Sequence, residues 1–256
     1  MPDKFLLSPY YIDSPLPSLQ PNGSAGWDHL AAPDASGESQ TGRLAALYPG
    51  LAGWVAAVAR KSDRPVTFAG DCCTAVPMLA GLQRAGIDPF LTWFDAHGDF
   101  NTWETTPSGF LGGMPLAWVV GRGEQTVPET VGLRPLLETD VILTDARDLD
   151  PGEAEAVSGS GMTHLKSTLD LLDHVLPERP LWVHFDTDVI RPEDAPAMNY
   201  LAPGGPSAED LGRVFDRLAA TGGICAVSVS AWNPALDPAG HTEAVVMGLF
   251  RRLIQK

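Results

Sequence analysis

Three side chains that can bind a metal ion stand two residues apart in the stretch Trp93 to Asn101, which reads W-F-D-A-H-G-D-F-N. Mostly apolar residues from Pro89 to Phe94 predict that a buried strand leads into Asp95, His97 and Asp99. In extended backbone, residues i, i+2 and i+4 point to one face, so these three side chains converge. Carboxylates and imidazole are ligands for divalent cations, but the same residues could form a solvated or hydrogen-bonded strand end. The motif alone leaves both interpretations open.

Two further predicted strands also lead into side chains that could bind a metal. Asp71 and Cys72 follow one short apolar stretch, and Asp186 and Asp188 follow a strand predicted over Pro180 to Phe185. Ligands of doubly wound sheets bind outside the carboxyl ends of the strands, so three such ends could face one crevice. This many carboxylates would carry too much negative charge for one ion, and carboxylates readily bridge two. The pattern predicts a centre with two metal ions, provided that the three strand ends are adjacent.

Strands alternate with helices along most of the chain. The helices are expected at 44–60 (broken at Pro49-Gly50), 75–85, 114–120, 167–176, 207–220 and 242–253. A first strand is expected at 4–11, with Pro9 ending it early. The predicted strands are apolar on both faces, which indicates a mostly parallel sheet with helices on both sides. We therefore predict one α/β domain over residues 1–256, a doubly wound three-layer sandwich in which residues 13–41 form a long loop or flexible excursion.

Composition and charge restrict the classes of partner. The 256 residues carry a net charge of −15, with 32 acidic against 17 basic side chains. This balance argues against a nucleic-acid or anionic-membrane partner, since both select basic surfaces. We expect neither a membrane span nor a signal peptide, and the three cysteines indicate a reducing compartment without a disulfide framework. A cytoplasmic protein that binds a small molecule is the expectation.

Several motifs, in order and at matching spacing, resemble those of the arginase–agmatinase (ureohydrolase) family. The resemblance covers the chain from about Val66 onward and implies an arginase-like sheet of about eight strands. The motifs are A-G-D-C at 69–72, D-A-H-G-D-F-N at 95–101, T-P-S-G-F-L-G-G-M-P at 106–115, R-D-L-D-P-G-E at 147–153, F-D-T-D at 185–188 and W-N-P at 232–234.

The resemblance implies two divalent metal ions, with Mn²⁺ expected first, held by six side chains: Cys72, Asp95, His97, Asp99, Asp186 and Asp188. The family has a histidine where this chain has Cys72. A thiolate is softer than imidazole and shifts the preference toward Zn²⁺ or Fe²⁺; alternatively, the thiol is unliganded and one ion is lost. A hydroxyarginine-hydrolysing relative of arginase, from cycloserine-type biosynthesis, resembles this chain both in this cysteine and in the loop from Asn101 to Met114.

The family resemblance also implies the substrate site. The residues expected to bind the α-carboxylate and α-amino groups of an amino acid are Asn101, Thr106, Ser108, Asp150 and Glu153, although Asp150 and Glu153 could equally cap a helix. Two family residues are missing, because the proton-shuttling histidine is Gly112 here and the glutamate that pairs with the guanidinium is Ala231. A buried cation without its carboxylate would be costly, so we expect a reacting group less basic than guanidinium.

The leading hypothesis is a metal-dependent C–N hydrolase that attacks Nω-hydroxyarginine, or a related hydroxyguanidino or ureido acid, with a hydroxide bridging the metals. Asp99 and His97 are the expected catalytic residues, and Asp99 would orient the hydroxide. Two alternatives stay open: a non-catalytic metal-binding family member with a binding or regulatory role, and an amide or acyl hydrolase on the same centre. The sequence leaves a monomer and a homo-oligomer equally open.

Overall fold

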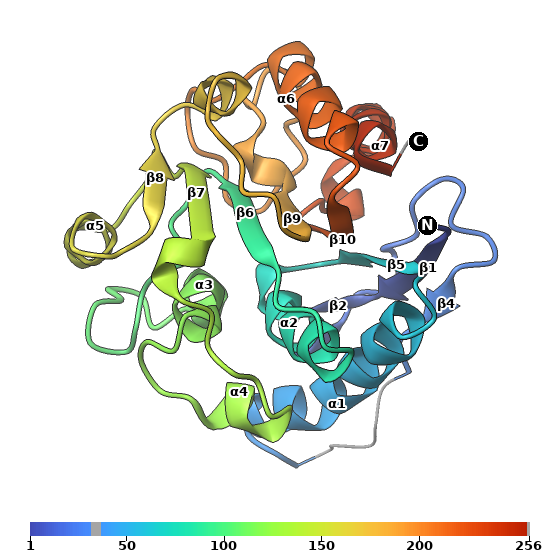
Figure 1. The fold of residues 1–256 in the computed structure, drawn as a ribbon, viewed down its shortest axis with the longest axis vertical. Helices are drawn as coiled ribbons and strands as arrows, with labels where there is room; N and C mark the ends of the chain where they lie inside the picture. The colour runs from blue at the N-terminus through green and yellow to red at the C-terminus, as the bar shows by residue number, and fades with distance from the viewer. Residues whose placement is uncertain (32–36, 255–256) are drawn as a thin grey trace.

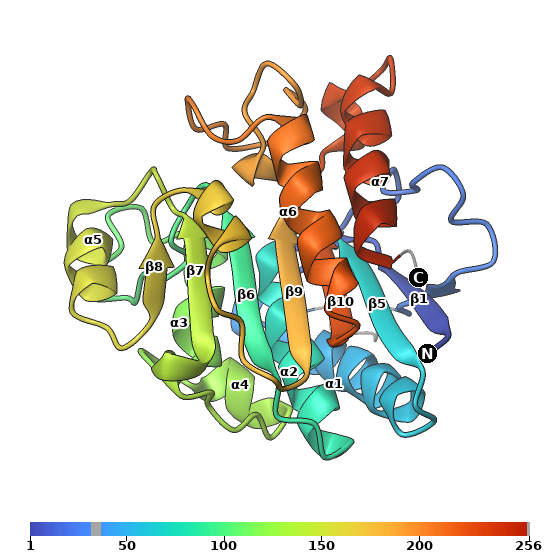
Figure 2. The same cartoon turned by 45° about the horizontal axis from the view of Figure 1, so that its top comes forward.

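The central feature of the fold is a parallel sheet. In a computed structural model, which describes residues 1–31 and 37–254, eight strands follow the order β4-β1-β5-β10-β9-β6-β7-β8 (Figure 2). Every neighbouring pair in this sheet is parallel, which confirms the predicted fold class. The strands are β1 (Asp3–Ser8), β4 (Asp28–His29), β5 (Arg64–Ala69), β6 (Phe90–Asp95), β7 (Val141–Asp145), β8 (Thr163–Leu165), β9 (Leu181–Asp186) and β10 (Ile224–Ser230).

Helices cover both faces of the sheet and enclose two hydrophobic cores (Figure 1). One face carries α1 (Gln40–Ala59), α2 (Ala75–Arg84), α3 (Pro115–Val119) and α4 (Thr126–Thr130), and the other carries α6 (Ala208–Ala220) and α7 (His241–Ile254). The short α5 (Pro151–Ser158) lies beside β8. Because side chains alternate along a strand, Trp93 enters the first core and its neighbour Phe94 the second. This double burial explains why the central strands are mostly apolar on both faces.

The predicted break at Pro49-Gly50 is wrong, because α1 runs through the proline. Pro49 is exposed, while Leu47, Tyr48 and Leu51 are buried. The apolar face is therefore continuous across the proline, and its packing against α2 outweighs the one backbone hydrogen bond that proline removes.

The first strand, β1, ends at Ser8, directly before Pro9, as expected. Tyr10–Tyr11 form a separate strand, β2, that was not predicted and that pairs antiparallel with β3 (Ser14–Pro15). Residues 13–41 contain β3, β4 and the start of α1, with 32–36 outside the described residues. Two smaller errors concern helices: the one expected at 167–176 is a 3-10 turn at Thr168–Leu172, and α4 was not predicted.

No helix within 1–31 and 37–254 is both long enough and apolar enough to cross a membrane.

Candidate metal centre and its pocket

The strand order brings the predicted ligands to one edge of the sheet. β9 and β6 are neighbours, and β5, which leads into Cys72, is separated from β9 only by β10. A cavity of about 310 Å³ opens at the carboxyl ends of these strands. Its walls include every predicted metal and substrate residue except Asp95, which is buried with 1% of its surface exposed. The condition that the sequence left open, adjacency of the strand ends, is therefore met in this fold.

Two groups of potential ligands share one carboxylate. Cys72, Asp95 and Asp99 form one group, and Asp95, His97 and Asp188 form the other, with the ligand atoms in each group within 4.8 Å of one another. His97 Nδ1 lies 3.1 Å from Asp188 Oδ2 and 3.5 Å from Asp95 Oδ1. If each group held one ion, Asp95 would be a ligand of both.

Asp186 joins the first group through the thiol. Cys72 Sγ donates to Asp186 Oδ2 at 2.7 Å and lies 3.0 Å from Ser230 Oγ. Cys73 faces away, since its Sγ lies 3.8 Å from the carbonyl oxygen of Leu111, and Cys225 is buried in β10. Of the three cysteines, only Cys72 is therefore placed to bind an ion of this centre.

Backbone and indole N–H groups hold the carboxylates in these positions. Asp95 accepts from the backbone N–H of His97 at 2.7 Å and from the indole Nε1 of Trp93 at 3.0 Å. Asp188 accepts from the backbone N–H of Ala96 at 3.2 Å, which ties the end of β9 to the end of β6. These contacts fix the carboxylates, as is usual for metal ligands.

The electrostatics of this cluster require positive charge. Burial, followed by repulsion between the carboxylates, raises the pKa values of four aspartates: Asp95, Asp99, Asp186 and Asp188. Burial lowers the pKa of His97, but Asp188 and Asp95 outweigh it and raise that pKa to about 12. Burial and the charge of Asp186 raise the pKa of Cys72. One imidazolium does not neutralise four carboxylates. Without a bound cation, the ionised carboxylates therefore repel one another in a buried environment.

The donor set suits divalent cations. Asp99 Oδ2 is buried and has no hydrogen-bond partner among the described residues, although a buried carboxylate oxygen normally has one. Its neighbours are mainly carboxylate oxygens, with one imidazole and one thiol, a set that Mn²⁺, Fe²⁺ and Zn²⁺ can accept. An ion bound here would give Asp99 a partner and relieve the repulsion described above.

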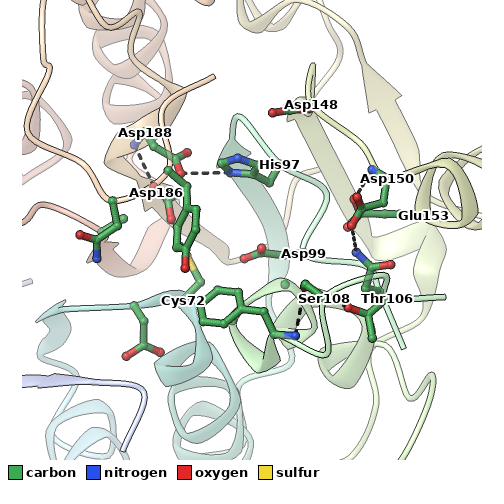
Figure 3. Close-up of a pocket in the computed structure, with 18 of the residues that line it drawn as sticks. Cys72, His97, Asp99, Thr106, Ser108, Asp148, Asp150, Glu153, Asp186 and Asp188 are labelled. Atoms are coloured by element: carbon green, nitrogen blue, oxygen red, sulfur yellow. Dashed lines mark hydrogen bonds and ion pairs between the residues drawn. The ribbon is translucent and has the colours of Figure 1, made fainter. Parts of the chain in front are cut away.

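The polar side of the pocket lies at β7 and α5, to the right of the aspartates in Figure 3. Asn101 Nδ2 donates to Asp150 Oδ2 at 3.0 Å, and Glu153 Oε1 accepts the backbone N–H of Phe100 at 2.8 Å. Asp150 is the N-cap of α5, and its N–H donates to Glu153 Oε2 at 3.3 Å. Asp150 and Glu153 therefore cap the helix and line the cavity at the same time, so the two interpretations of these residues are compatible.

Thr106 and Ser108 belong to the loop that closes this side. The Thr106 hydroxyl accepts the backbone N–H of Gly109 at 3.1 Å, and the Ser108 hydroxyl accepts that of Phe110 at 3.1 Å. The two hydroxyl oxygens lie 3.4 Å apart and both residues line the cavity. One hydroxyl can donate to the other, which leaves the second O–H free to donate to a ligand.

Several pocket residues were not identified from the sequence. Tyr11, Phe110, Asp148, Asn199 and Tyr200 line the cavity. Tyr11 belongs to the N-terminal hairpin, which reaches the site because Ile12 N–H donates to Asp71 Oδ2 at 2.6 Å. No spacing pattern in the sequence links these five residues. Only Asp148 and Phe110 could have been identified, because each lies inside a recognised motif.

The chain's similarity to known proteins agrees with this arrangement. Residues 33–255 match the model of the arginase family, which is well over half of the chain. The chain belongs to the arginase family. The family match begins before Val66 and takes in the described part of α1, so the resemblance reaches further toward the N-terminus than the motifs indicated. The chain is thus an enzyme of the ureohydrolase type, a class of hydrolases that act on guanidino C–N bonds and depend on two metal ions.

The names of individual relatives give two different activities. The arginase of Bacillus subtilis is 30% identical over 218 residues, which cover 80% of this chain and 74% of the relative. The N(omega)-hydroxy-L-arginine amidinohydrolase of Streptomyces lavendulae is 30% identical over 184 residues, 69% of this chain and 63% of that protein. The solved structure of Bacillus subtilis arginase superposes with a TM-score of 0.84 at 24% identity, covering 100% of this chain and 99% of that one, which supports the fold.

Proposed function

We propose that this arginase-family enzyme hydrolyses the guanidino-type C–N bond of an amino acid whose reacting group is weakly basic, with Nω-hydroxyarginine as the first candidate. The observation that carries the proposal is that position 231, where the family pattern has the glutamate that pairs with a guanidinium, has no carboxylate. Ala231 lines the cavity with a methyl group, and Gly112 offers no side chain at all. The similarity to a hydroxyarginine amidinohydrolase supports the same substrate.

The six predicted ligands would hold two divalent ions, with Mn²⁺ first and Zn²⁺ or Fe²⁺ as the alternatives that Cys72 favours. When bound, such ions lower the pKa of an attacking water and stabilise the negative charge that develops on the reacting group. His97 contributes neutral imidazole to this set, which requires that its proton leave when an ion binds.

Asp99 is the proposed proton carrier. Asp99 lines the cavity and has two carboxylate oxygens, so one oxygen would hold an ion while the other accepts a proton from the attacking water. With no side chain at position 112, the leaving amine receives its proton from Asp99 or from solvent.

The amino-acid end of the substrate is proposed to lie at Asn101, Thr106, Ser108, Asp150 and Glu153. Asp150 and Glu153 would attract the α-ammonium, and the hydroxyl and amide donors would bind the α-carboxylate. These groups sit on loops tied by internal hydrogen bonds, so they would orient the substrate with its reacting carbon over the aspartates.

Metal analysis and a substrate panel test this proposal. We expect about two divalent ions per chain and a kcat/KM for Nω-hydroxyarginine that exceeds the value for arginine at pH 7. Faster turnover of arginine would contradict the substrate proposal. Hydrolysis of amide or ester analogues alone would favour changed chemistry on the same centre, and metal binding without turnover of any acid in the panel would favour a binding role.

A further inference from the structure

Three aromatic rings form a contiguous part of the cavity lining. Tyr11 and Phe110 lie 6.5 Å apart between ring centroids at an interplanar angle of 24°, and Phe110 and Tyr200 lie 5.2 Å apart at 45°. Tyr11 comes from β2, Phe110 from the loop after β6 and Tyr200 from the segment after β9. All three line the cavity, and we call them the aromatic wall.

The ring of Phe110 fills the space that a side chain at position 112 would need. A Cβ placed on Gly112 would lie 2.4 Å from Cε1 and 2.5 Å from Cζ of this ring. Neither distance is a permissible contact, so the phenyl ring and a side chain at position 112 exclude each other unless one of them moves. The missing histidine is thus replaced by an apolar surface rather than by an empty space.

Asp71 is the carboxylate whose charge acts on Tyr11, and both of its oxygens already accept backbone N–H groups. Oδ2 accepts from Ile12 and Oδ1 from Cys73. Ala231 and Asn199 are uncharged, and the cavity lining contains neither lysine nor arginine. Burial and contact with Tyr200 raise the pKa of Tyr11, so its hydroxyl is a neutral hydrogen-bonding group at physiological pH.

The strand order places the metal ligands between Tyr11 and the polar side, whereas Phe110 and Tyr200 follow β6 and β9, the strands that lead into the aspartates. Along the carboxyl edge, Tyr11 lies beyond β5, the aspartates follow β9 and β6, and Asp150 lies beyond β7. A substrate whose amino-acid end lies at β7 and whose reacting carbon lies over the aspartates therefore directs its terminal nitrogen toward β10 and the aromatic wall.

We propose that the aromatic wall is the specificity-determining subsite for the terminal nitrogen, and that it selects an uncharged nitrogen substituent, such as the hydroxyl of an Nω-hydroxyguanidine, over a protonated guanidinium. Tyr11 is the hydrogen-bond partner of that hydroxyl, and Phe110 provides the flat surface. This inference rests on the proposed function, because it assumes that the reacting carbon lies over the aspartates.

The test compares kcat/KM for Nω-hydroxyarginine and arginine in the wild type, Tyr11→Phe and Phe110→Leu. We expect each substitution to lower the value for Nω-hydroxyarginine by about tenfold, the loss of one good contact, and to change that for arginine by less than about threefold. Tyr10→Phe is the matched control, since it removes a hydroxyl from the same hairpin at a side chain outside the cavity. Calorimetric binding in an Asp99→Asn background, where turnover is slow, should show the same selective loss of affinity.

The possible results separate this inference from the proposed function. A wild type that prefers arginine contradicts the proposed function itself. A wild type that prefers Nω-hydroxyarginine, with the same preference in Tyr11→Phe and Phe110→Leu, contradicts only the role of the wall. A larger loss for arginine than for Nω-hydroxyarginine would mean that the rings bind a cation through their faces, and it would also overturn the inference.

Discussion

The polar side and the aromatic side of the pocket have diverged to different degrees from the arginase-family pattern. On the polar side, Asn101, Ser108, Asp150 and Glu153 keep the residue types of the family motifs. On the aromatic side, the family's histidine and glutamate positions hold Gly112 and Ala231, and a phenyl ring occupies the space at position 112. The difference supports the proposed function, in which recognition of an amino acid is retained and recognition of the reacting group has changed.

The largest expected effect is on metal content and turnover, and it follows from substitution of Asp95. Asp95→Asn removes the ligand that both groups share, so we expect loss of both ions and a fall in kcat of about 10³-fold or more. Elemental analysis and steady-state kinetics measure these effects. Asp88→Asn, which alters an exposed carboxylate in a surface ion pair, should leave both unchanged. Full metal content in Asp95→Asn would show that this carboxylate is not the bridge.

The second effect is on the pH dependence of stability of the metal-free protein. Burial raises the pKa of Glu153 to about 7 from 4.5, so the folded state binds more protons than the unfolded state between these values. Stability from this group is complete below pH 4.5 and is lost as the pH rises toward 7, by about 2 kcal/mol between pH 5 and pH 7.

Urea unfolding at pH 5 and pH 7 measures this loss. Glu153→Gln should reduce the difference between the two pH values, whereas Glu155→Gln, at an exposed position of the same helix, should retain it. An unchanged pH dependence in Glu153→Gln would locate the titration elsewhere.

The third effect tests recognition on the polar side. Asp150→Asn keeps a residue type that caps helices well but removes the negative charge, so KM for amino-acid substrates should rise by about tenfold. A substrate without an α-amino group should be unaffected. Asp210→Asn, which changes a carboxylate at the start of α6, serves as the control. An equal rise in KM for both substrates would remove Asp150 from the α-amino site.

The smallest effect tests the packing of the aromatic side. Gly112→Ala should lower the free energy of unfolding by about 1–3 kcal/mol through overpacking against Phe110. In a Phe110→Ala background the cost should shrink by about 1 kcal/mol. Gly113→Ala is the matched control, because the nearest atom to its Cβ would be Asn101 Nδ2 at 3.8 Å. Strictly additive losses in denaturant unfolding would argue against direct contact between the two positions.

These differences also explain how far sequence reasoning can reach. The period-two spacing of Asp95, His97 and Asp99 and the buried strands before them are local signals, so the sheet and the ligand cluster could be predicted. Tyr11 reaches the pocket only because a hairpin is tied to Asp71 by a contact between residues 59 positions apart. The course of α1 through Pro49 likewise depends on packing against α2, which no local pattern encodes.

The backbone at Ala231 has a consequence for how such an enzyme can change its substrate. This residue has a φ of +74°, a conformation that asparagine, aspartate and histidine adopt more readily than β-branched or bulky residues do. Exchanging alanine for asparagine or aspartate would therefore change the chemistry facing the substrate without adding strain to the main chain. Substitutions at position 231 can therefore change the substrate range during evolution. The scaffold and the ion-binding residues are under separate selection.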